Sequence, residues 1–436
     1  MFRRSRGILP AAVLAVAAPS LTADIGYVGN NGNGLGTTVS VWNTGDHQRN
    51  AASPVTVGGG PEDLAIVGTN LYVTSFAGDS LSIISTTTNT VTQTKTTSVG
   101  DPGSAGLAFN QPTAVAPIAT VPTHIVMADR PTSAYLRFID TNTNLVSREF
   151  PFIGGVEPVD IVTTLSQLVC MSDEGTTDRV WLIDIADAPL FTTTPPTALA
   201  TISGADDPSI NLPGRLAVDS ATNLLYVTNR GSNSVTVIDL PSRAFLQAID
   251  VGSPQGDIEI IGDVIYVSLL NSDTVARIDR PGRTVLAPAI TGFGANLFGL
   301  GRPTDSASFL YVGSNTASNT VYLVDLTTTP NSIRASFNVD DTGTTEFAFT
   351  GGGTATASQL AGGTTTTTTN ITGADRHDDG RTVNRNLDSG GATHTTSKKR
   401  RKFYNCYLDI AGDPAGRAAG GAVLLLLGAA FRRRKS

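Results

Sequence analysis

The residues of this sequence best suited to chemistry are carboxylates that stand beside short apolar segments. Several precede such a segment, and others fall in the polar loop between two of them. The strongest candidates are Glu62, Asp63, Glu157, Asp160, Asp206, Asp207 and Asp257. Comparable positions hold Asp101, Asp129, Asp173, Glu174, Asp178 and Asp273, with Arg130, Arg215 and Arg230 as basic exceptions. Carboxylates that converge from several segments would focus negative potential and attract a cation or a basic partner.

Two interpretations of this acidic set stay open. We hypothesise that these residues share one face of the molecule, where they bind a cation or a basic ligand. Alternatively they are ordinary turn residues, because Asp readily accepts hydrogen bonds from nearby backbone. No cofactor is predicted, and a divalent cation is left open as a ligand of this acidic face.

Other kinds of reactive site are excluded on residue counts and motifs. Only His47 and His124 precede residue 351, so a histidine-rich redox or metal site is excluded there. The sequence has no Cys-x-x-Cys-His, His-Glu-x-x-His or Gly-x-Ser-x-Gly motif. The glycine runs at 58–60 and 351–353 lack the Lys-Ser/Thr of a phosphate loop. No catalytic or cofactor-binding residue is therefore predicted.

Composition and charge limit the partners. The chain has 436 residues, 45 of them Gly, and a formal net charge of −7. Without its basic ends the remainder carries about −14, which argues against a nucleic-acid partner. The two cysteines, Cys170 and Cys406, cannot form a disulfide framework, and Cys170 is expected to be a buried small apolar residue.

A repeated hairpin must position the carboxylates. In Asn223–Asp239, two apolar strands flank the turn-forming run Asn-Arg-Gly-Ser-Asn. The unit occurs seven times, at intervals of 40 to 57 residues, with first-strand anchors Tyr27, Tyr72, Val126, Val169, Tyr226, Tyr266 and Tyr311. The second strands are 38–43, 80–85, 135–140, 179–184, 234–239, 274–279 and 320–325. Such a period is typical of four-stranded propeller blades.

The motifs in this hairpin resemble the YVTN family of β-propellers. The resemblance is carried by LYVT at 71–74, LYVTN at 225–229, IYVS at 265–268 and LYVG at 310–313, and it covers about 24–351. It implies a propeller fold and says little about function. Related propellers include lactonase-like hydrolases and dehydrogenases, so an enzyme is the alternative that the resemblance implies.

The two ends of the repeat predict how the ring closes. The first unit lacks an inner strand, whereas an extra strand, Glu346–Thr350, follows the seventh unit. We therefore predict an all-β fold, a seven-bladed β-propeller of four-stranded blades, closed by the C-terminal strand completing the first blade. The turns before the inner strands and the hairpin loops are expected to share one face. The propeller is expected to be monomeric.

The regions outside 24–351 have the character of export and anchoring segments. Residues 1–23 are typical of a secretory signal peptide, with three arginines, an apolar run and cleavage after Ala23. Residues 352–405 form a polar Thr/Gly-rich stretch, which predicts a disordered stalk. Residues 406–436 resemble a GlyGly-type bacterial sorting signal, with Gly420 and Gly421, an apolar run and a basic end. Cys406 is either modified near the processing site or a bystander.

These observations predict an exported protein at the cell surface, in the outer envelope or outside the cell. Membrane contact is expected only through the C-terminal segment. We expect a binding or scaffold module that uses one propeller face for a protein, peptide or envelope ligand. The alternatives are a propeller enzyme, either a lactonase-like hydrolase or a dehydrogenase, and a structural component of a surface layer.

Overall fold

The computed structural model describes residues 24–350 and 368–369. It leaves out 33, 103, 105, 119, 131–133, 153–154, 166–167, 186–196, 295, 304–307, 315–318 and 342. The predicted signal peptide with Ala23, and the tail with Cys406, Gly420 and Gly421, lie outside the described residues, as does nearly all of the predicted stalk. The part that is described contains strands and no helix that is long and apolar enough to cross a membrane.

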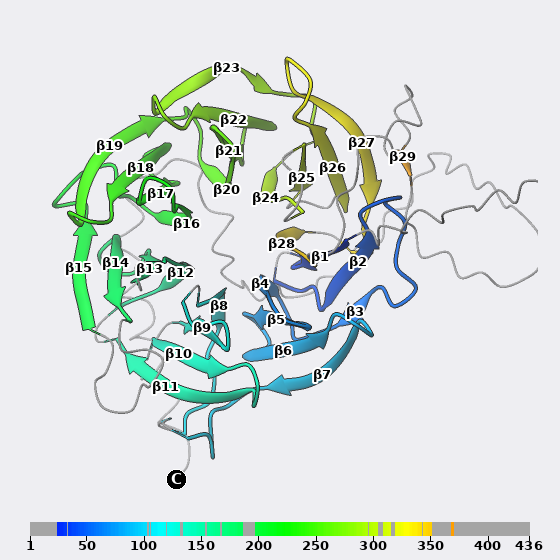
Figure 1. Cartoon of the computed structure of the whole chain (residues 1–436), viewed down its shortest axis with the longest axis vertical. Coiled ribbons are helices and arrows are strands. Elements are labelled where there is room, and N and C mark those ends of the chain that lie inside the picture. Colours follow the sequence, from blue (N-terminus) through cyan, green and yellow to red (C-terminus); the bar gives the residue numbers. More distant parts are fainter. Residues whose placement is uncertain are drawn as a thin grey trace, which may run out of the picture. The chain divides into compact units, whose positions relative to one another are not determined.

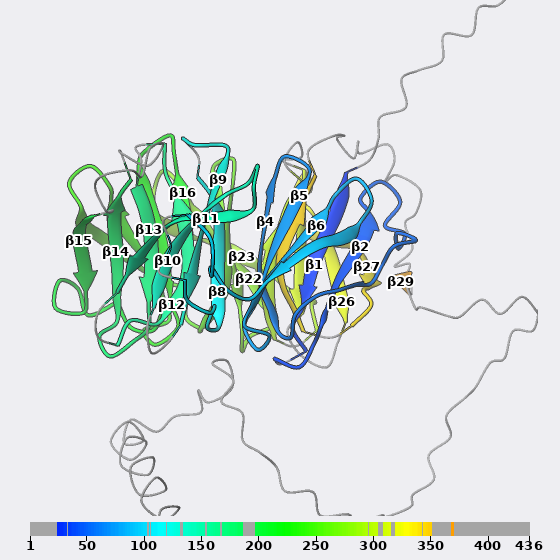
Figure 2. The same ribbon diagram turned by 90° about the horizontal axis from the view of Figure 1, so that it is seen from below.

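Seven four-stranded antiparallel sheets form a ring (Figure 1). Blade 1 combines β28 with β1, β2 and β3, and blades 2 to 7 each use four consecutive strands, from β4–β7 through to β24–β27. Seen from the side, the strands run between the two faces of the disc (Figure 2). The prediction of a seven-bladed propeller is confirmed.

Within each blade, the four strands follow one another from the centre of the ring outward. The inner strands are β4 (Pro61–Val67), β8 (Pro112–Pro117), β12 (Pro158–Thr163), β16 (Pro213–Asp219), β20 (Gln255–Ile261), β24 (Leu297–Gly301) and β28 (Thr344–Phe349). The second strands are β1 (Ile25–Asn30), β5 (Asn70–Ser75), β9 (His124–Asp129), β13 (Leu168–Asp173), β17 (Leu224–Asn229), β21 (Val264–Leu269) and β25 (Phe309–Ser314).

The third strands have the bounds predicted from the sequence. They are β2 (Thr38–Asn43), β6 (Ser80–Ser85), β10 (Tyr135–Asp140), β14 (Arg179–Asp184), β18 (Ser234–Asp239), β22 (Thr274–Asp279) and β26 (Thr320–Asp325). The outer strands are β3 (Val55–Thr56), β7 (Thr90–Lys95), β11 (Leu145–Pro151), β15 (Thr197–Ser203), β19 (Ala244–Asp250), β23 (Thr284–Ile290) and β27 (Ser332–Asn338). A two-residue strand, β29 (Thr368–Thr369), pairs in parallel with β27.

The two ends of the propeller segment close the ring together. Strand β28 pairs antiparallel with β1, so that Tyr27 lies opposite Ala348. The backbone N–H of Ile25 donates to the Thr350 hydroxyl at 2.9 Å, and the Thr350 N–H donates to the Ile25 carbonyl at 3.0 Å. The predicted closure is therefore confirmed, although the strand begins two residues before Glu346.

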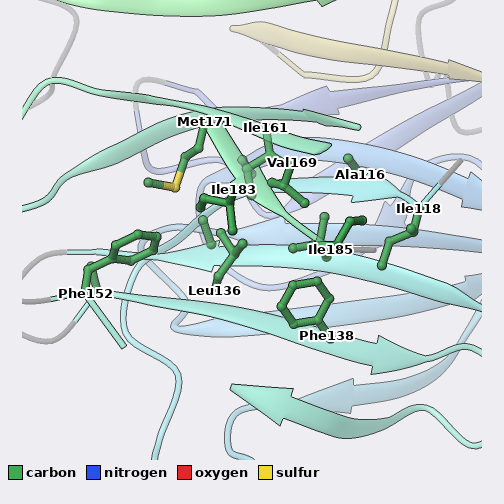
Figure 3. Close-up of a cluster of buried hydrophobic side chains, with 14 of the residues drawn as sticks. Ala116, Ile118, Leu136, Phe138, Phe152, Ile161, Val169, Met171, Ile183 and Ile185 are labelled. Atoms are coloured by element: carbon green, nitrogen blue, oxygen red, sulfur yellow. The ribbon is translucent and has the colours of Figure 1, made fainter. Parts of the chain in front are cut away.

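The hydrophobic core lies between blades. Each of seven buried clusters combines side chains from two neighbouring blades. Figure 3 shows the cluster between blades 3 and 4, where Leu136 and Phe138 of β10 face Ile161 and Met171. Burial of these β-branched and aromatic side chains on both faces of each sheet is the main stabilising term of the ring.

The anchor tyrosines add polar contacts to this packing. The Tyr27 hydroxyl donates to Asn89 Oδ1 of blade 2 at 2.5 Å, and the Tyr72 hydroxyl donates to Asn144 Oδ1 of blade 3 at 3.0 Å. Both asparagines end a tight turn with φ near +55°, a conformation that Asn tolerates better than most residues. These two anchor tyrosines thus join their own blade to the next one.

Candidate functional site

The inner strands bring seven equivalent residues to the centre of the ring. Near the start of each inner strand, the register of its pairing with the second strand shifts. The residues at these shifts occupy the same position in all seven blades and together form a ring around the channel. In blade order from 1 to 7, these ring residues are Glu346, Asp63, Ala114, Asp160, Arg215, Asp257 and Gly299. The ring therefore has four carboxyl groups and one guanidinium group.

The three aspartates of the ring connect blades in pairs. Asp63 accepts hydrogen bonds from the backbone N–H of Leu64 and of Val115, both at 2.7 Å. Asp160 does the same with Ile161 at 2.8 Å and Leu216 at 2.7 Å. In each case one oxygen binds the aspartate's own blade and the other binds the following blade.

Asp257 forms the third of these carboxylate clamps. It accepts from the N–H of Ile258 and of Leu300, both at 2.7 Å. The clamps thus join blade 2 to 3, blade 4 to 5 and blade 6 to 7. Each satisfies two backbone donors that the register break would otherwise leave unpaired in a buried place.

The hydroxyl residue of the repeat motif completes the ring. Thr74 and Thr228 each accept a hydrogen bond from the N–H of a ring residue, Asp63 at 3.0 Å and Arg215 at 2.8 Å. Ser268 holds the N–H of Asp257 in the same way at 2.8 Å. The Thr or Ser that follows Tyr-Val in the motif is therefore a backbone ligand of the ring.

Glu346 and Arg215 differ from the clamp aspartates. The Arg215 side chain is 3% exposed, and its Nη1 lies 3.7 Å from Asp160 Oδ1 while its Nη2 lies 3.9 Å from Glu346 Oε2. Its guanidinium also lies 5.5 Å from the centre of the Phe298 ring. Glu346 makes no hydrogen bond within the described residues, and its side chain keeps 21% of its surface exposed toward the channel.

A cavity of about 560 Å³ extends from the ring residues along the inner strands. Fourteen of its 21 lining residues are apolar, and five are carboxylates: Asp63, Asp160, Asp257, Glu259 and Glu346. No Lys, Arg or His is among the described residues that line it. The lining reaches Ser220 and Phe349, where inner strands end, and so runs away from the face on which the acidic set was expected.

Burial raises the pKa of these carboxyl groups. The pKa values of Asp63 and Asp257 are raised to about 7, mainly by desolvation, which the positive charge of Arg215 partly opposes. The pKa of Glu346 is raised well above its ordinary value by burial, followed by the charge of Asp257. Burial also raises the pKa of Asp160. Desolvation of the charged form is thus the main cause of the raised pKa values in the ring.

The other four predicted carboxylates do not join the ring. Glu62 is buried and accepts a hydrogen bond from Asn31 Nδ2 at 2.9 Å, and Glu157 pairs with Arg130 at 2.8 Å. Asp206 and Asp207 accept hydrogen bonds from Ser203 and Ser209 within their own turn. For these two the interpretation as turn residues is confirmed.

One expectation about position was wrong. Glu62, Asp63, Asp160 and Asp257 lie within inner strands, not in the turns before them. The strands begin at Pro61, Pro158 and Gln255, and the register of pairing with the second strand shifts a few residues later. The aspartate at this shift stays in the extended chain, and its side chain accepts the backbone hydrogen bonds that the shift leaves unpaired. Asp63, Asp160 and Asp257 therefore lie two residues inside the strands that start at the expected face, whereas Glu157, Asp206 and Asp207 lie outside the strands.

A separate ion-pair network occupies the face that carries the hairpin loops. Arg130 Nη2 lies 2.8 Å from both Glu157 and Glu174, and Arg230 also pairs with Glu174. The loops and the turns meet there, as in the bond from the Arg230 N–H to the Leu212 carbonyl at 3.1 Å. That part of the expected face is confirmed, but its carboxylates are neutralised by arginines.

Another carboxylate of the expected face is buried. Asp129 pairs with Arg137 at 2.8 Å, and Arg137 also pairs with Glu149 inside blade 3. The described residues contain no group of three His, Cys, Asp or Glu side chains arranged to hold a metal ion. Of the seven predicted carboxylates, Asp63, Asp160 and Asp257 line the central cavity.

Sequence reasoning missed Glu346 and Glu259 as site residues. Glu346 was placed in the closing strand, but it was not compared with the residues at the same position of other inner strands. Aligning that strand with Asp63, Asp160 and Asp257 would have identified Glu346 as a fourth carboxylate of the ring. Glu259 follows Asp257 by two residues, so the strand alternation alone would have indicated that both point to one side.

No known family model matches this sequence, and no curated protein matches it. A Bacteroides fragilis protein, provisionally assigned as a 6-phosphogluconolactonase, matches over 76% of this chain and 99% of its own, with 18% identity and a TM-score of 0.55. The dihydro-heme d1 dehydrogenase NirN matches over 76% of this chain, which spans 66% of NirN, with 13% identity and a TM-score of 0.49. The first likeness supports the shared fold alone.

Proposed function

We propose that this chain is an exported propeller of the YVTN type that binds a small, cation-bearing ligand in its central cavity. The observation that carries the proposal is the set of five carboxylates lining a cavity that has no basic residue among its described lining. Carboxylates in a partly desolvated cavity interact with a cation more strongly than carboxylates on an open surface.

The dimensions of the cavity support a small ligand. Its volume of about 560 Å³ falls within the range of small-molecule sites, roughly 300–1,000 Å³. The lining is mostly apolar with a few polar groups, which is the usual make-up of such sites. A whole folded partner would contact only the rim.

Export and anchoring form the second part of the proposal. The apolar run before Ala23 supports secretion, and the Gly420-Gly421 pair with its basic end supports sorting to the envelope. A propeller held outside the cell by a stalk would present its cavity to ligands in the surroundings. Binding, rather than turnover, is the role that this arrangement supports best.

The proposed function is tested by titration calorimetry of the full chain at about pH 8. The probes are calcium chloride, a primary alkylamine and a lysine-rich peptide, each compared with an anion of similar size. We expect heat from at least one cation and none from the anions. If none of the three cations binds, the proposed function is wrong.

An enzyme is the second candidate, because one observation favours it. Carboxyl groups with pKa values near 7, such as Asp63 and Asp257, can give and take protons at neutral pH, as a hydrolase requires. Against this, both oxygens of each aspartate already accept backbone hydrogen bonds. Hydrolysis of a panel of lactones by the full chain, lost in Asp257→Asn, would move the enzyme to first place.

A further inference from the structure

We propose that the cavity selects an amphipathic organic cation, whose charged end pairs with Glu346 and whose apolar body lies along the inner strands. This inference rests on the proposed function and names the ligand class of the same cavity. Two features carry it. Glu346 is the ring carboxylate that forms no backbone clamp, and the part of the cavity beyond the ring is mostly apolar.

The odd number of blades explains why Glu346 forms no clamp. The carboxylate clamps join blades two at a time, namely 2 with 3, 4 with 5 and 6 with 7. A ring of seven leaves one blade without a clamp partner, and this is blade 1, which carries Glu346. Asp63 already fills the equivalent position of the following blade, so a backbone clamp from Glu346 to blade 2 is not formed.

The surroundings of Glu346 favour a cation. It faces Arg215, whose Nη2 lies 3.9 Å from Oε2, beyond hydrogen-bond distance. Arg215 also faces Asp160 at 3.7 Å, so one guanidinium serves several carboxylates. The charges of Asp257, Asp63 and Asp160 all act on Glu346 and, with burial, raise its pKa. A second positive charge would relieve this repulsion.

The apolar wall of the cavity extends from the ring to the ends of the inner strands. Its partly exposed members are Ile66, Val162, Val218 and Phe349, each from a different blade. The strand segment from ring to end is about four residues, or roughly 13 Å at the usual rise per residue. An aliphatic or aromatic body of that length would bury its surface against this wall.

The same features disfavour other cations. A bare divalent ion needs several free oxygen ligands, but the three clamp aspartates already use theirs on backbone N–H groups. A polyamine would place a second ammonium group against the apolar wall, at a desolvation cost. An alkylammonium ion avoids both penalties. The Glu259–Arg302 ion pair, at 2.9 Å and partly exposed, adds polar groups near the strand ends.

Titration calorimetry of the full chain with a matched series of probes tests the inference. The series is methylammonium, hexylammonium, hexanol, hexanoate, spermidine and calcium, at about pH 8. We expect hexylammonium to bind most tightly, because it alone combines the charge with an apolar body. Glu346→Gln should weaken hexylammonium binding by about tenfold or more, since it removes the charge but keeps the shape. Asp206→Asn, in an exposed turn, is the matched control and should bind as the natural chain does.

The outcomes separate this inference from the proposed function. If methylammonium or calcium binds as tightly as hexylammonium, or if Glu346→Gln binds hexylammonium unchanged, the ligand class is wrong while cation binding stands. If no cation binds the natural chain, the proposed function itself fails. Circular dichroism of Glu346→Gln establishes that the variant is folded. Equal hexanol binding by the variant and the natural chain shows that the apolar wall of the cavity is unchanged.

Discussion

Asp63, Asp160 and Asp257 belong to the residue type that usually marks a catalytic or metal site, yet each holds two backbone N–H groups in place. The hydrogen bonds cross from one blade to the next and are buried. A buried carboxylate with two good donors is a structural element whatever else it does. The chemical candidate in the same ring is the carboxylate without such donors, Glu346.

Removing one clamp should therefore cost more than removing an exposed carboxylate. Asp160→Ala leaves the N–H groups of Ile161 and Leu216 without their acceptor. We expect the free energy of unfolding to fall by about 2–4 kcal/mol, because each unsatisfied buried donor costs about 1–3 kcal/mol. Urea denaturation measures the change.

Asp206→Ala is the matched control for the clamp. Asp206 is exposed and accepts only from Ser203 in its own turn, so we expect a loss of under about 1 kcal/mol. Equal losses in the two variants would show that the clamp bonds do not stabilise the ring.

The ring carboxyls should also make stability depend on pH. The pKa values of Asp63 and Asp257 are raised to about 7 in the folded protein, against about 3.9 in an unfolded chain. Their contribution is therefore full below about pH 4 and is lost as the pH rises through about 7. Asp257→Asn should flatten the change in unfolding free energy between about pH 5 and pH 8 by about 1–3 kcal/mol relative to the natural chain.

His47 makes the free energy of unfolding depend on pH in the opposite direction. Burial lowers the pKa of His47 to about 4, so its contribution is lost as the pH falls from about 6.5. Because His47 is present in both proteins, comparing the natural chain with Asp257→Asn cancels its effect. If denaturant titrations give both proteins the same pH profile, Asp257 does not titrate near neutrality.

Among the strands, the bounds that the sequence predicts best are those of the third strands, which all share one pattern of alternating apolar and polar residues. All seven third strands begin and end where the alternation of Val, Ile and polar residues predicted. The inner strands were harder, because their starts contain Pro, Gly and Asp, which are typical of turns. Only pairing with the second strand shows that Pro61 and Pro158 are already part of the sheet.

The site was less predictable than the fold for a related reason. Sequence reasoning found three ring carboxylates but grouped them with Asp206 and Asp207, which have the same residue type and similar spacing. Whether a carboxylate points into the channel depends on the register break in its strand. Glu346 was missed because it comes from the far end of the chain, where no repeat follows it.

The closing strand gives a prediction about the boundary of the propeller. A chain that ends before Thr344 lacks β28, which leaves the inner edge of β1 unpaired and Val28 and Trp42 exposed to water. We expect this chain to aggregate or to lose its cooperative unfolding transition. A chain that ends after Gly351 keeps β28 and should unfold like the full chain.

Size-exclusion chromatography and thermal unfolding by circular dichroism distinguish the two truncations. The longer one serves as the control, because it keeps all 28 strands of the seven blades and, among the described residues, removes only the two-residue strand β29 that pairs with β27. If the shorter chain is monomeric and unfolds at the same temperature as the longer one, β28 is not required for closure.

For the whole molecule, the decisive measurement is the intact mass of protein purified from its native envelope. We expect a chain from Asp24 to near Gly420, with or without a lipid-sized increment, because the sequence of each end resembles a processing signal. A mass that includes both ends would contradict the sorting proposal. A further bound mass of cofactor size would instead favour an enzyme.

The pairing of β1 with β28 also has a consequence for how this protein is made. The bond between Ile25 and Thr350 spans 325 residues, so β1, the first propeller strand to be synthesised, stays without its partner β28 until the last propeller strand is made. Blades 2 to 7 can assemble in turn, but blade 1 stays open until β28 is synthesised. A chain that pauses late in synthesis would therefore expose a nearly finished ring with one unprotected edge, and that interval is when chaperones or proteases could act on it.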